Sequence, residues 1–84
     1  MSVYIYGAPG CIWCERAKDL AKQYDLEFTY VDVKENIDNQ KAFRMRFPDA
    51  KTIPQIVWNG NHIGGYTEFA TEIENTRNYG DGQV

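Results

Sequence analysis

Residues 2–14 decide the fold, and they read Ser2-Val3-Tyr4-Ile5-Tyr6-Gly7-Ala8-Pro9-Gly10-Cys11-Ile12-Trp13-Cys14. Residues 3–6 are β-branched or aromatic, which predicts a strand over residues 2–6. Residues 7–10 break that strand, because glycine and proline favour turns. From Cys11 the pattern becomes that of an amphipathic helix of about three turns. Its apolar positions are Trp13, Ala17, Leu20, Ala21 and Tyr24. Two cysteines therefore lie where a strand turns into a helix.

Downstream, the pattern predicts a second strand and a second helix. Asp25 ends the first helix, and residues 26–33 (LEFTYVDV) are typical of a strand. A strand, a helix and another strand form a βαβ unit with parallel strands and a right-handed crossover. Asn36 or Asp38 could cap the second helix, and Pro48 stops it. The expected apolar positions of that helix are Ile37, Ala42, Phe43, Met45 and Phe47.

The last third of the chain predicts a hairpin followed by a helix. Asn59-Gly60 lies between residues 55–58 and 61–63, and it is a strong hairpin signal because a type I′ turn needs positive φ at both positions. A last helix is predicted from about Thr67 to Tyr79, and residues 80–84 are predicted to be a frayed tail. The order β-α-β-α-β-β-α predicts an α/β fold, a mixed four-stranded sheet with three helices, in a single domain over residues 1–79.

The length of 84 residues leaves room for one domain. Hydrophobic residues make up 43% of the chain and charged residues 25%, which is typical of an ordered globule. A net charge of −3 without a basic stripe argues against nucleic acid as a partner. The apolar run over residues 3–6 is too short to span a membrane, and no basic segment precedes it. We therefore expect a cytoplasmic protein, in which a structural disulfide would usually be reduced and two cysteines call for a chemical explanation.

Cys11 and Cys14 are the strongest candidates for chemistry. Free N–H groups and the macrodipole at a helix N-terminus favour a thiolate and lower the pKa of a cysteine placed there. Cys11 is predicted at that position, whereas Cys14, one turn further, is predicted to be more buried and within disulfide reach. We therefore expect Cys11 to attack a disulfide and Cys14 to resolve the mixed disulfide.

Two other interpretations of the cysteines remain open at this point. A zinc site needs two further ligands, and the chain holds no other cysteine and a single histidine, His62, of the kind that is usually a solvated strand residue. The cysteines could also be inert core side chains. Their place at a strand-to-helix junction between turn residues favours redox use, and no metal is expected.

The segment Thr52-Ile53-Pro54 is a candidate for binding an extended substrate. Proline holds the residue before it extended. If the bond were cis, the free N–H and C=O of Ile53 could pair with a short extended chain. A trans turn is the commoner state of such a bond. Beside it, Lys51 is the cation that we single out, because it could meet a second carboxylate on a bound peptide; the plainer interpretation is a surface lysine.

The segment Gly64-Gly65-Tyr66-Thr67-Glu68 is a second candidate for binding. Two glycines and a helix start could hold a carboxylate, with Glu68 on an adjacent ammonium group. The plainer interpretation is a hairpin exit with Thr67 as an N-cap. Tyr66 and Trp13 are spaced as core residues, although Trp13 could equally be an exposed wall beside the sulfur.

Taken together, these motifs resemble the dithiol glutaredoxins of the small bacterial type. The resemblance runs from Val3 to about Ala70. It is carried by Gly10-Cys11-x-x-Cys14 with residues 16–21, by Tyr30-Val31-Asp32-Val33, by residues 52–56 and by residues 62–67. It implies a thioredoxin-like fold with a cis bond at Pro54. It also implies an oxidoreductase that reduces protein disulfides and glutathione mixed disulfides, with glutathione as cosubstrate.

The resemblance also implies a single glutathione groove. Ile53 would pair with the cysteinyl backbone of glutathione, and Thr67 and Glu68 would hold its γ-glutamyl carboxylate and amine. Lys51 would meet the glycine carboxylate, and two aromatic side chains would form the walls. The groove would comprise Trp13, Lys51, Thr52, Ile53, Pro54, Gly65, Tyr66, Thr67 and Glu68. The implied partners are disulfide-containing or glutathionylated proteins, with ribonucleotide reductase as a typical client, and we expect a monomer.

Three residues depart from the family pattern. Ile12 replaces the usual proline, Ala8 a common basic residue and Glu68 the usual aspartate. In this family, sites without that proline more often bridge an iron–sulfur cluster between two monomers. One alternative is therefore a dimer that holds a [2Fe–2S] cluster by Cys11 and glutathione, as a carrier or sensor. The other is a redoxin reduced by thioredoxin reductase.

Overall fold

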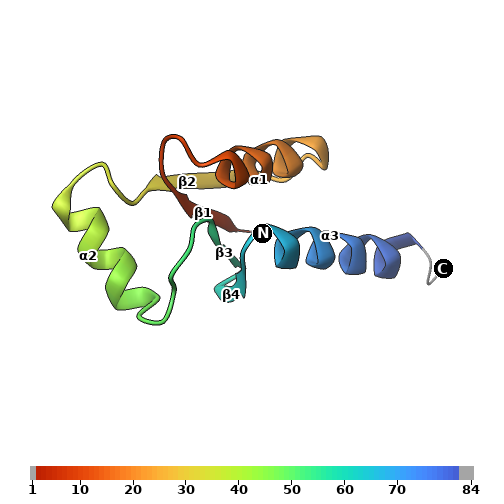
Figure 1. Cartoon of the computed structure of the whole chain (residues 1–84). Coiled ribbons are helices and arrows are strands. Elements are labelled where there is room, and N and C mark those ends of the chain that lie inside the picture. Colours follow the sequence, from red (N-terminus) through yellow and green to blue (C-terminus); the bar gives the residue numbers. More distant parts are fainter. Residues whose placement is uncertain (1, 82–84) are drawn as a thin grey trace.

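A four-stranded sheet lies at the centre of the molecule, with helices on both of its faces (Figure 1). The computed structural model describes residues 2–81, and side chains as far as residue 75. The elements in chain order are β1 (Val3–Gly7), α1 (Ile12–Gln23), β2 (Phe28–Asp32), α2 (Ile37–Arg46), β3 (Gln55–Trp58), β4 (Asn61–Gly64) and α3 (Tyr66–Asp81). This is the predicted order, and the predicted mixed sheet with three helices is confirmed.

The strands lie in the order β2-β1-β3-β4. β1 pairs in parallel with β2, as a βαβ unit requires, and antiparallel with β3. β3 and β4 form the predicted hairpin, with Asn59 at φ 53° and Gly60 at φ 83°. Positive φ at both positions is what a type I′ turn needs, so the turn follows from these two residue types.

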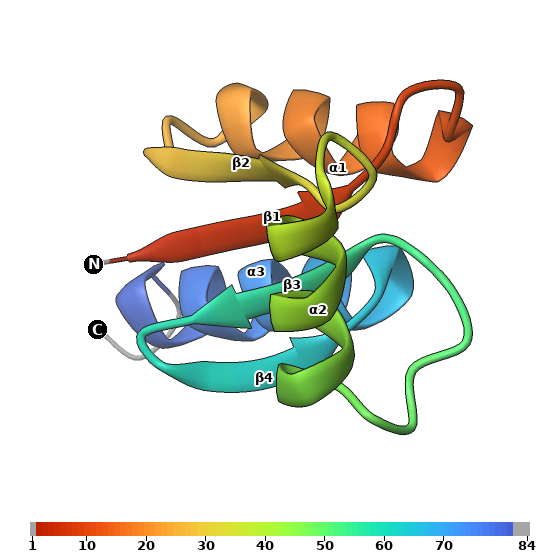
Figure 2. The same cartoon turned by 90° about the vertical axis from the view of Figure 1, so that its left-hand side faces the viewer.

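The main core lies between the sheet and the helices α1 and α3, which cover the same face (Figure 2). Side chains alternate along β1, so Val3 and Ile5 enter this core, whereas Tyr6 lies on the other face against α2. The buried core residues are Val3, Ile5, Ala17, Ala21, Ile56, Trp58, Phe69 and Ile73. The start of α1 is thereby held against the carboxyl end of β1.

Helix α2 covers the opposite face with fewer contacts than its sequence predicts. Asn36 is its N-cap and accepts from the backbone N–H of Asn39 at 2.8 Å, which decides between the two predicted caps. Phe43 and Phe47 pack against Tyr6, with ring centroids 6.3 and 5.2 Å away. The prediction was wrong for the other three apolar positions. Phe43 and Phe47 are four residues apart and share one side of the helix, whereas the other three point elsewhere. Ile37, Ala42 and Met45 are exposed.

The predicted limits of the last helix need correction at both ends. α3 begins at Tyr66 rather than Thr67, and it continues through Gly80 to Asp81 rather than ending at Tyr79. Glycine costs a helix only about 1 kcal/mol relative to alanine, so it does not by itself end one. Residues 80–81 are thus helical rather than part of a frayed tail, and residues 82–84 lie outside the described part of the chain. Over the described residues, no helix has the length and hydropathy needed to cross a membrane.

Candidate active site

The two cysteines lie at the start of α1 and are joined in a disulfide. Cys11 is the N-cap, with extended backbone at φ −91° and ψ 108°, and its sulfur accepts from the backbone N–H of Cys14 at 3.1 Å. Their Cα atoms are 5.2 Å apart, within the usual range for a disulfide. Cys11 is partly exposed, whereas Cys14 is fully buried, as the spacing predicts. A sulfur at the surface is thus backed by a sulfur inside.

The turn before α1 brings the cysteines to the end of β1. Gly10 has φ 82°, a conformation that other residues rarely adopt, and the N–H of Cys11 bonds the carbonyl of Ala8 at 3.4 Å. Gly7 lies directly against the buried cysteine. A β-carbon at Gly7 would lie 2.6 Å from the Cys14 sulfur, so only glycine lets that side chain pack against the strand.

The loop before β3 lies beside the exposed sulfur. The Ile53–Pro54 peptide bond is cis, as the resemblance implies, and the carbonyl oxygen of Ile53 is 3.8 Å from the Cys11 sulfur. Pro54 is buried, Ile53 is half-buried, and Thr52 and Lys51 are exposed. The segment therefore presents backbone groups next to the atom at which a disulfide would react.

A hydrogen-bonded pair that the sequence analysis missed holds this loop. Gln55 is 7% exposed, and its Nε2 donates to the carbonyl of Thr52 at 2.9 Å. Its Oε1 lies 2.6 Å from Nε2 of His62, whose ring packs against Phe47 at 4.5 Å between centroids. His62 is an exposed strand residue, as expected, but one face of its ring is also held by these two contacts. The register of the hairpin could have indicated this pair. His62 is opposite Val57, and Gln55 lies on the same face of the sheet as Val57.

Trp13 forms a wall beside the cysteines and is no core residue. It is 48% exposed, and its ring centroid is 5.3 Å from that of Tyr66 at the start of α3. The guanidinium carbon of Arg16 lies 4.7 Å from the Trp13 ring centroid on α1. The sequence analysis did not connect Arg16 with Trp13, although a spacing of three places both on one side of the helix. The contacts of the Trp13 ring with Tyr66 and Arg16 hold an aromatic surface in place next to Cys11.

The start of α3 differs from the predicted N-cap at Thr67. Thr67 is the second residue of the helix, and the capping position falls to Gly65, whose carbonyl accepts from Phe69 N–H at 2.9 Å. Glu68 Oε1 accepts from the Gly65 N–H at 2.9 Å, which is one half of a capping box. Glycine has no side chain with which to cap the first-turn N–H groups. Within the described part of the chain, the capping position therefore offers those donors no side-chain acceptor.

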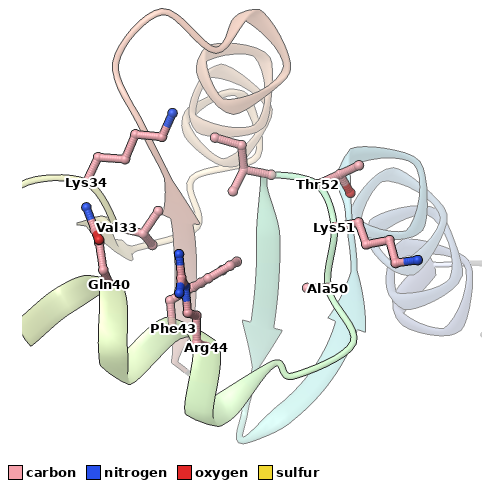
Figure 3. A pocket seen from close by; sticks show the side chains of 9 residues that line it. Val33, Lys34, Gln40, Phe43, Arg44, Ala50, Lys51 and Thr52 are labelled. Carbon is pink, nitrogen blue, oxygen red and sulfur yellow. The ribbon is translucent and has the colours of Figure 1, made fainter. Parts of the chain in front are cut away.

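A cavity of about 410 Å³ lies between α2 and the loop that precedes the cis bond (Figure 3). It brings Lys51, Thr52 and Ile53 together with two cations that the sequence did not single out, Lys34 and Arg44. In Figure 3, Lys34 and Lys51 lie on opposite sides of the cavity, and Lys51 points away from it. Among the described residues, no three of His, Cys, Asp or Glu gather in the manner of a metal site.

Comparisons with a family model, with related sequences and with solved structures all point to one family. The glutaredoxin family model matches residues 3–63. Glutaredoxin 1 of Escherichia coli is 38% identical over 80 residues, which cover 88% of this chain and 94% of that protein. The structure of reduced E. coli glutaredoxin has a TM-score of 0.77 and 33% identity, covering 93% of this chain and 99% of that one. A buckwheat glutaredoxin–glutathione complex, at TM-score 0.75 and 19% identity, covers 89% of this chain and 70% of its own and shares the fold.

The match takes in the cysteines and the loop beside them, and it ends before the start of α3. Residues 3–63 include both cysteines, the Ile53–Pro54 bond and the Gln55–His62 pair. Glutaredoxins use glutathione as a substrate and exchange thiols for disulfides, which is the chemistry that a surface sulfur backed by a buried one can perform. On sequence, fold and paired cysteines alike, the chain belongs to the glutaredoxin family of thiol–disulfide oxidoreductases.

Proposed function

We propose that Cys11 is the attacking thiol and Cys14 the resolving thiol of a glutathione-dependent cycle. The Cys11 thiolate attacks one sulfur of a substrate disulfide, the substrate's S–S bond breaks, and the departing thiolate takes a proton from water. Cys14, deprotonated, then attacks the Cys11 sulfur, releases the second substrate thiolate and leaves the Cys11–Cys14 disulfide. Two glutathione molecules reduce that disulfide, and they are themselves oxidised to glutathione disulfide.

The hydrogen bond from the Cys14 N–H to the Cys11 sulfur carries this assignment. At 3.1 Å it supplies a donor to one sulfur only, and at a helix start such a donor stabilises the thiolate. Exposure supports the same order, because Cys11 is accessible, whereas Cys14 is 0% exposed and can attack only the Cys11 sulfur, once a substrate sulfur is joined to it. For glutathionylated proteins, Cys11 alone suffices, with a second glutathione in place of Cys14.

We further propose that glutathione lies across the loop at Ile53 and the start of α3. The Ile53 carbonyl, 3.8 Å from the Cys11 sulfur, is placed to accept from the cysteinyl N–H of a glutathione joined to that sulfur. The γ-glutamyl carboxylate would take the N–H groups of Thr67 and Glu68, which Gly65 leaves without a side-chain cap. The rings of Trp13 and Tyr66, with centroids 5.3 Å apart, would form the aromatic wall of this groove.

The two ends of glutathione carry charges that this groove would meet. Glu68 would hold the γ-glutamyl amine with the carboxylate oxygen that does not bond Gly65. Lys51 would meet the glycine carboxylate, beside Thr52 and buried Pro54. Both side chains are exposed, so each contact is worth little by itself and specificity depends on the backbone.

Turnover with a choice of reductant tests the proposal. The purified protein is assayed on 2-hydroxyethyl disulfide with glutathione, glutathione reductase and NADPH, and in parallel with thioredoxin reductase and NADPH. We expect NADPH consumption to be fast in the first mixture and absent in the second. Turnover with thioredoxin reductase alone would overturn glutathione dependence and favour the redoxin alternative.

The cellular setting is proposed on the same grounds. We infer a cytoplasmic monomer that reduces disulfide-containing or glutathionylated proteins, ribonucleotide reductase among them, as the family resemblance supports. Sedimentation of the reduced protein with glutathione checks the monomer. A dimer with visible absorbance after anaerobic reconstitution with iron and sulfide would instead support the alternative of a [2Fe–2S] cluster held by Cys11 and glutathione.

A further inference from the structure

Gly7 has two reactive side-chain atoms packed against it. Besides the Cys14 sulfur at 2.6 Å, the hydroxyl oxygen of Tyr30 lies 2.8 Å from the place where a β-carbon on Gly7 would stand. Tyr30 comes from β2, where it is opposite Ile5 in the parallel register, and its side chain is half-buried. Strand β1, helix α1 and strand β2 thus place a phenol oxygen and the buried sulfur next to the same point on Gly7.

The sulfurs of Cys11 and Cys14 differ in the hydrogen-bond donors around them. The Cys11 sulfur accepts from the Cys14 N–H, whereas no N–H of the described residues donates to the Cys14 sulfur. Cys14 is 0% exposed, so water cannot stabilise negative charge on it. A buried thiolate without a donor is costly, and yet the resolving step needs charge on this sulfur.

The surroundings of Tyr30, and its burial above all, favour the protonated form of its hydroxyl. Burial raises its pKa above the ordinary value, Asp32 and Glu15 act in the same direction, and Lys18 opposes them. Lys18 lies over the Tyr30 ring, with its Nζ 4.3 Å from the centroid, and is paired with Glu15 at 3.0 Å. At neutral pH the phenol is therefore a donor and not a base.

We propose that the Tyr30 hydroxyl donates a hydrogen bond to the Cys14 sulfur while that sulfur carries charge in thiol–disulfide exchange. In the resolving step Cys14 loses its proton to solvent and attacks the Cys11 sulfur. The bond from Cys11 to the substrate sulfur breaks, and the substrate leaves as a thiolate that water protonates. In the reverse direction Cys14 is the leaving group, and the same donor stabilises it. Gly7 is required because a side chain there would displace both atoms.

The test separates the resolving step from the first attack. Reduced protein is mixed with excess 2-hydroxyethyl disulfide, quenched in acid at successive times and analysed by mass spectrometry, which distinguishes the mixed disulfide from the Cys11–Cys14 disulfide. Tyr30→Phe is compared with wild type and with Tyr4→Phe, a control on β1 at a residue that is 40% exposed. The probe needs no glutathione groove, so the outcome does not depend on the glutathione part of the proposed function and rests only on the assigned cysteine roles.

We expect Tyr30→Phe to slow ring closure about tenfold at neutral pH, the usual effect of losing a hydrogen bond to a charged group. The rise of the closure rate with pH should move to higher pH, and Tyr4→Phe should match wild type. In a Cys14→Ser background, where only the first attack occurs, Tyr30→Phe should change nothing. An unchanged closure rate would overturn the proposal. So would equal slowing of both steps, because that pattern indicates a distorted site.

Discussion

The backbone N–H of Cys14 points at the sulfur of Cys11 from 3.1 Å, so the buried cysteine of the pair stabilises the exposed one through its main chain. A serine at position 14 keeps that N–H. We therefore expect Cys14→Ser protein, which has a single thiol, to react with iodoacetamide faster than free cysteine throughout about pH 5 to 8. Alkylation in denaturant is the control, and it should return the rate to that of free cysteine. Equal rates folded and unfolded would show that the helix start does not activate the sulfur.

The unequal burial of the cysteines predicts unequal effects of removing them. Cys11→Ser should abolish reduction of every disulfide, because Cys14 is 0% exposed and cannot meet a substrate. Cys14→Ser should lose reduction of protein disulfides but keep removal of glutathione from a glutathionylated peptide. Both activities are measured on the two variants, with circular dichroism to check folding. A folded Cys14→Ser protein without activity on the glutathionylated peptide would contradict the assigned roles.

Glu68 is predicted to have two separable functions, capping α3 and binding the amine of glutathione. Its Oε1 accepts from the Gly65 N–H at 2.9 Å, and a glutamine at this third helical position can do the same. Glu68→Gln should therefore keep the free energy of unfolding but raise the KM for glutathione about two- to fivefold, as expected for an exposed ion pair. Glu68→Ala should lose about 1 kcal/mol of stability as well. If the glutamine variant binds glutathione as wild type does, the carboxylate has no part in holding the amine.

Gln55 is predicted to support the glutathione loop from beneath. Replacing it with leucine removes the donor at 2.9 Å from the Thr52 carbonyl and leaves that group without its partner, at a cost of about 1–3 kcal/mol in the free energy of unfolding. Since Thr52 adjoins Ile53, we expect the KM for glutathione to rise while Cys11 alkylation in the Cys14→Ser background is unchanged. Urea unfolding and steady-state kinetics measure the two effects. A loss of stability with an unchanged KM would show that Gln55 stabilises the fold and has no effect on glutathione binding.

Local chemistry made most of the fold predictable. The type I′ turn follows from Asn59-Gly60, and the first helix follows from a period of apolar residues that begins at Cys11. Helix α2 was less predictable, since its contact with the sheet is made by Phe43 and Phe47, and nothing local distinguishes these from exposed Met45. Short helices with two contacts carry little periodic signal.

The candidate site divides in the same way. Cys11, Cys14 and the Ile53–Pro54 bond occur as contiguous motifs, so sequence reasoning found them. The Gln55–His62 pair and the approach of Tyr30 to Gly7 and Cys14 depend on strand register and on the packing of three elements. Such contacts join residues that are unremarkable one at a time, and only the assembled sheet brings them together.

Ile12 provides the last prediction, because it replaces the proline usual in the family and lies at the first position of α1. Proline is favoured at that position, and the residue before it must be extended, as Cys11 already is at φ −91° and ψ 108°. Ile12 is 61% exposed, so its side chain contributes little packing. Ile12→Pro should therefore fold and gain about 0.4–1 kcal/mol in the free energy of unfolding, since it restricts the unfolded chain.

Ile12→Ala is the matched control, because it removes the same side chain without fixing φ, and it should gain no stability. If the missing proline is what permits a cluster-bridged dimer, visible absorbance after anaerobic reconstitution with iron, sulfide and glutathione should be retained in Ile12→Ala and lost in Ile12→Pro. Equal absorbance in wild type, Ile12→Ala and Ile12→Pro would show that cluster binding does not depend on the residue at position 12. A destabilised Ile12→Pro protein would show that the N–H of Ile12 is needed at the start of α1, contrary to the expected tolerance of proline there.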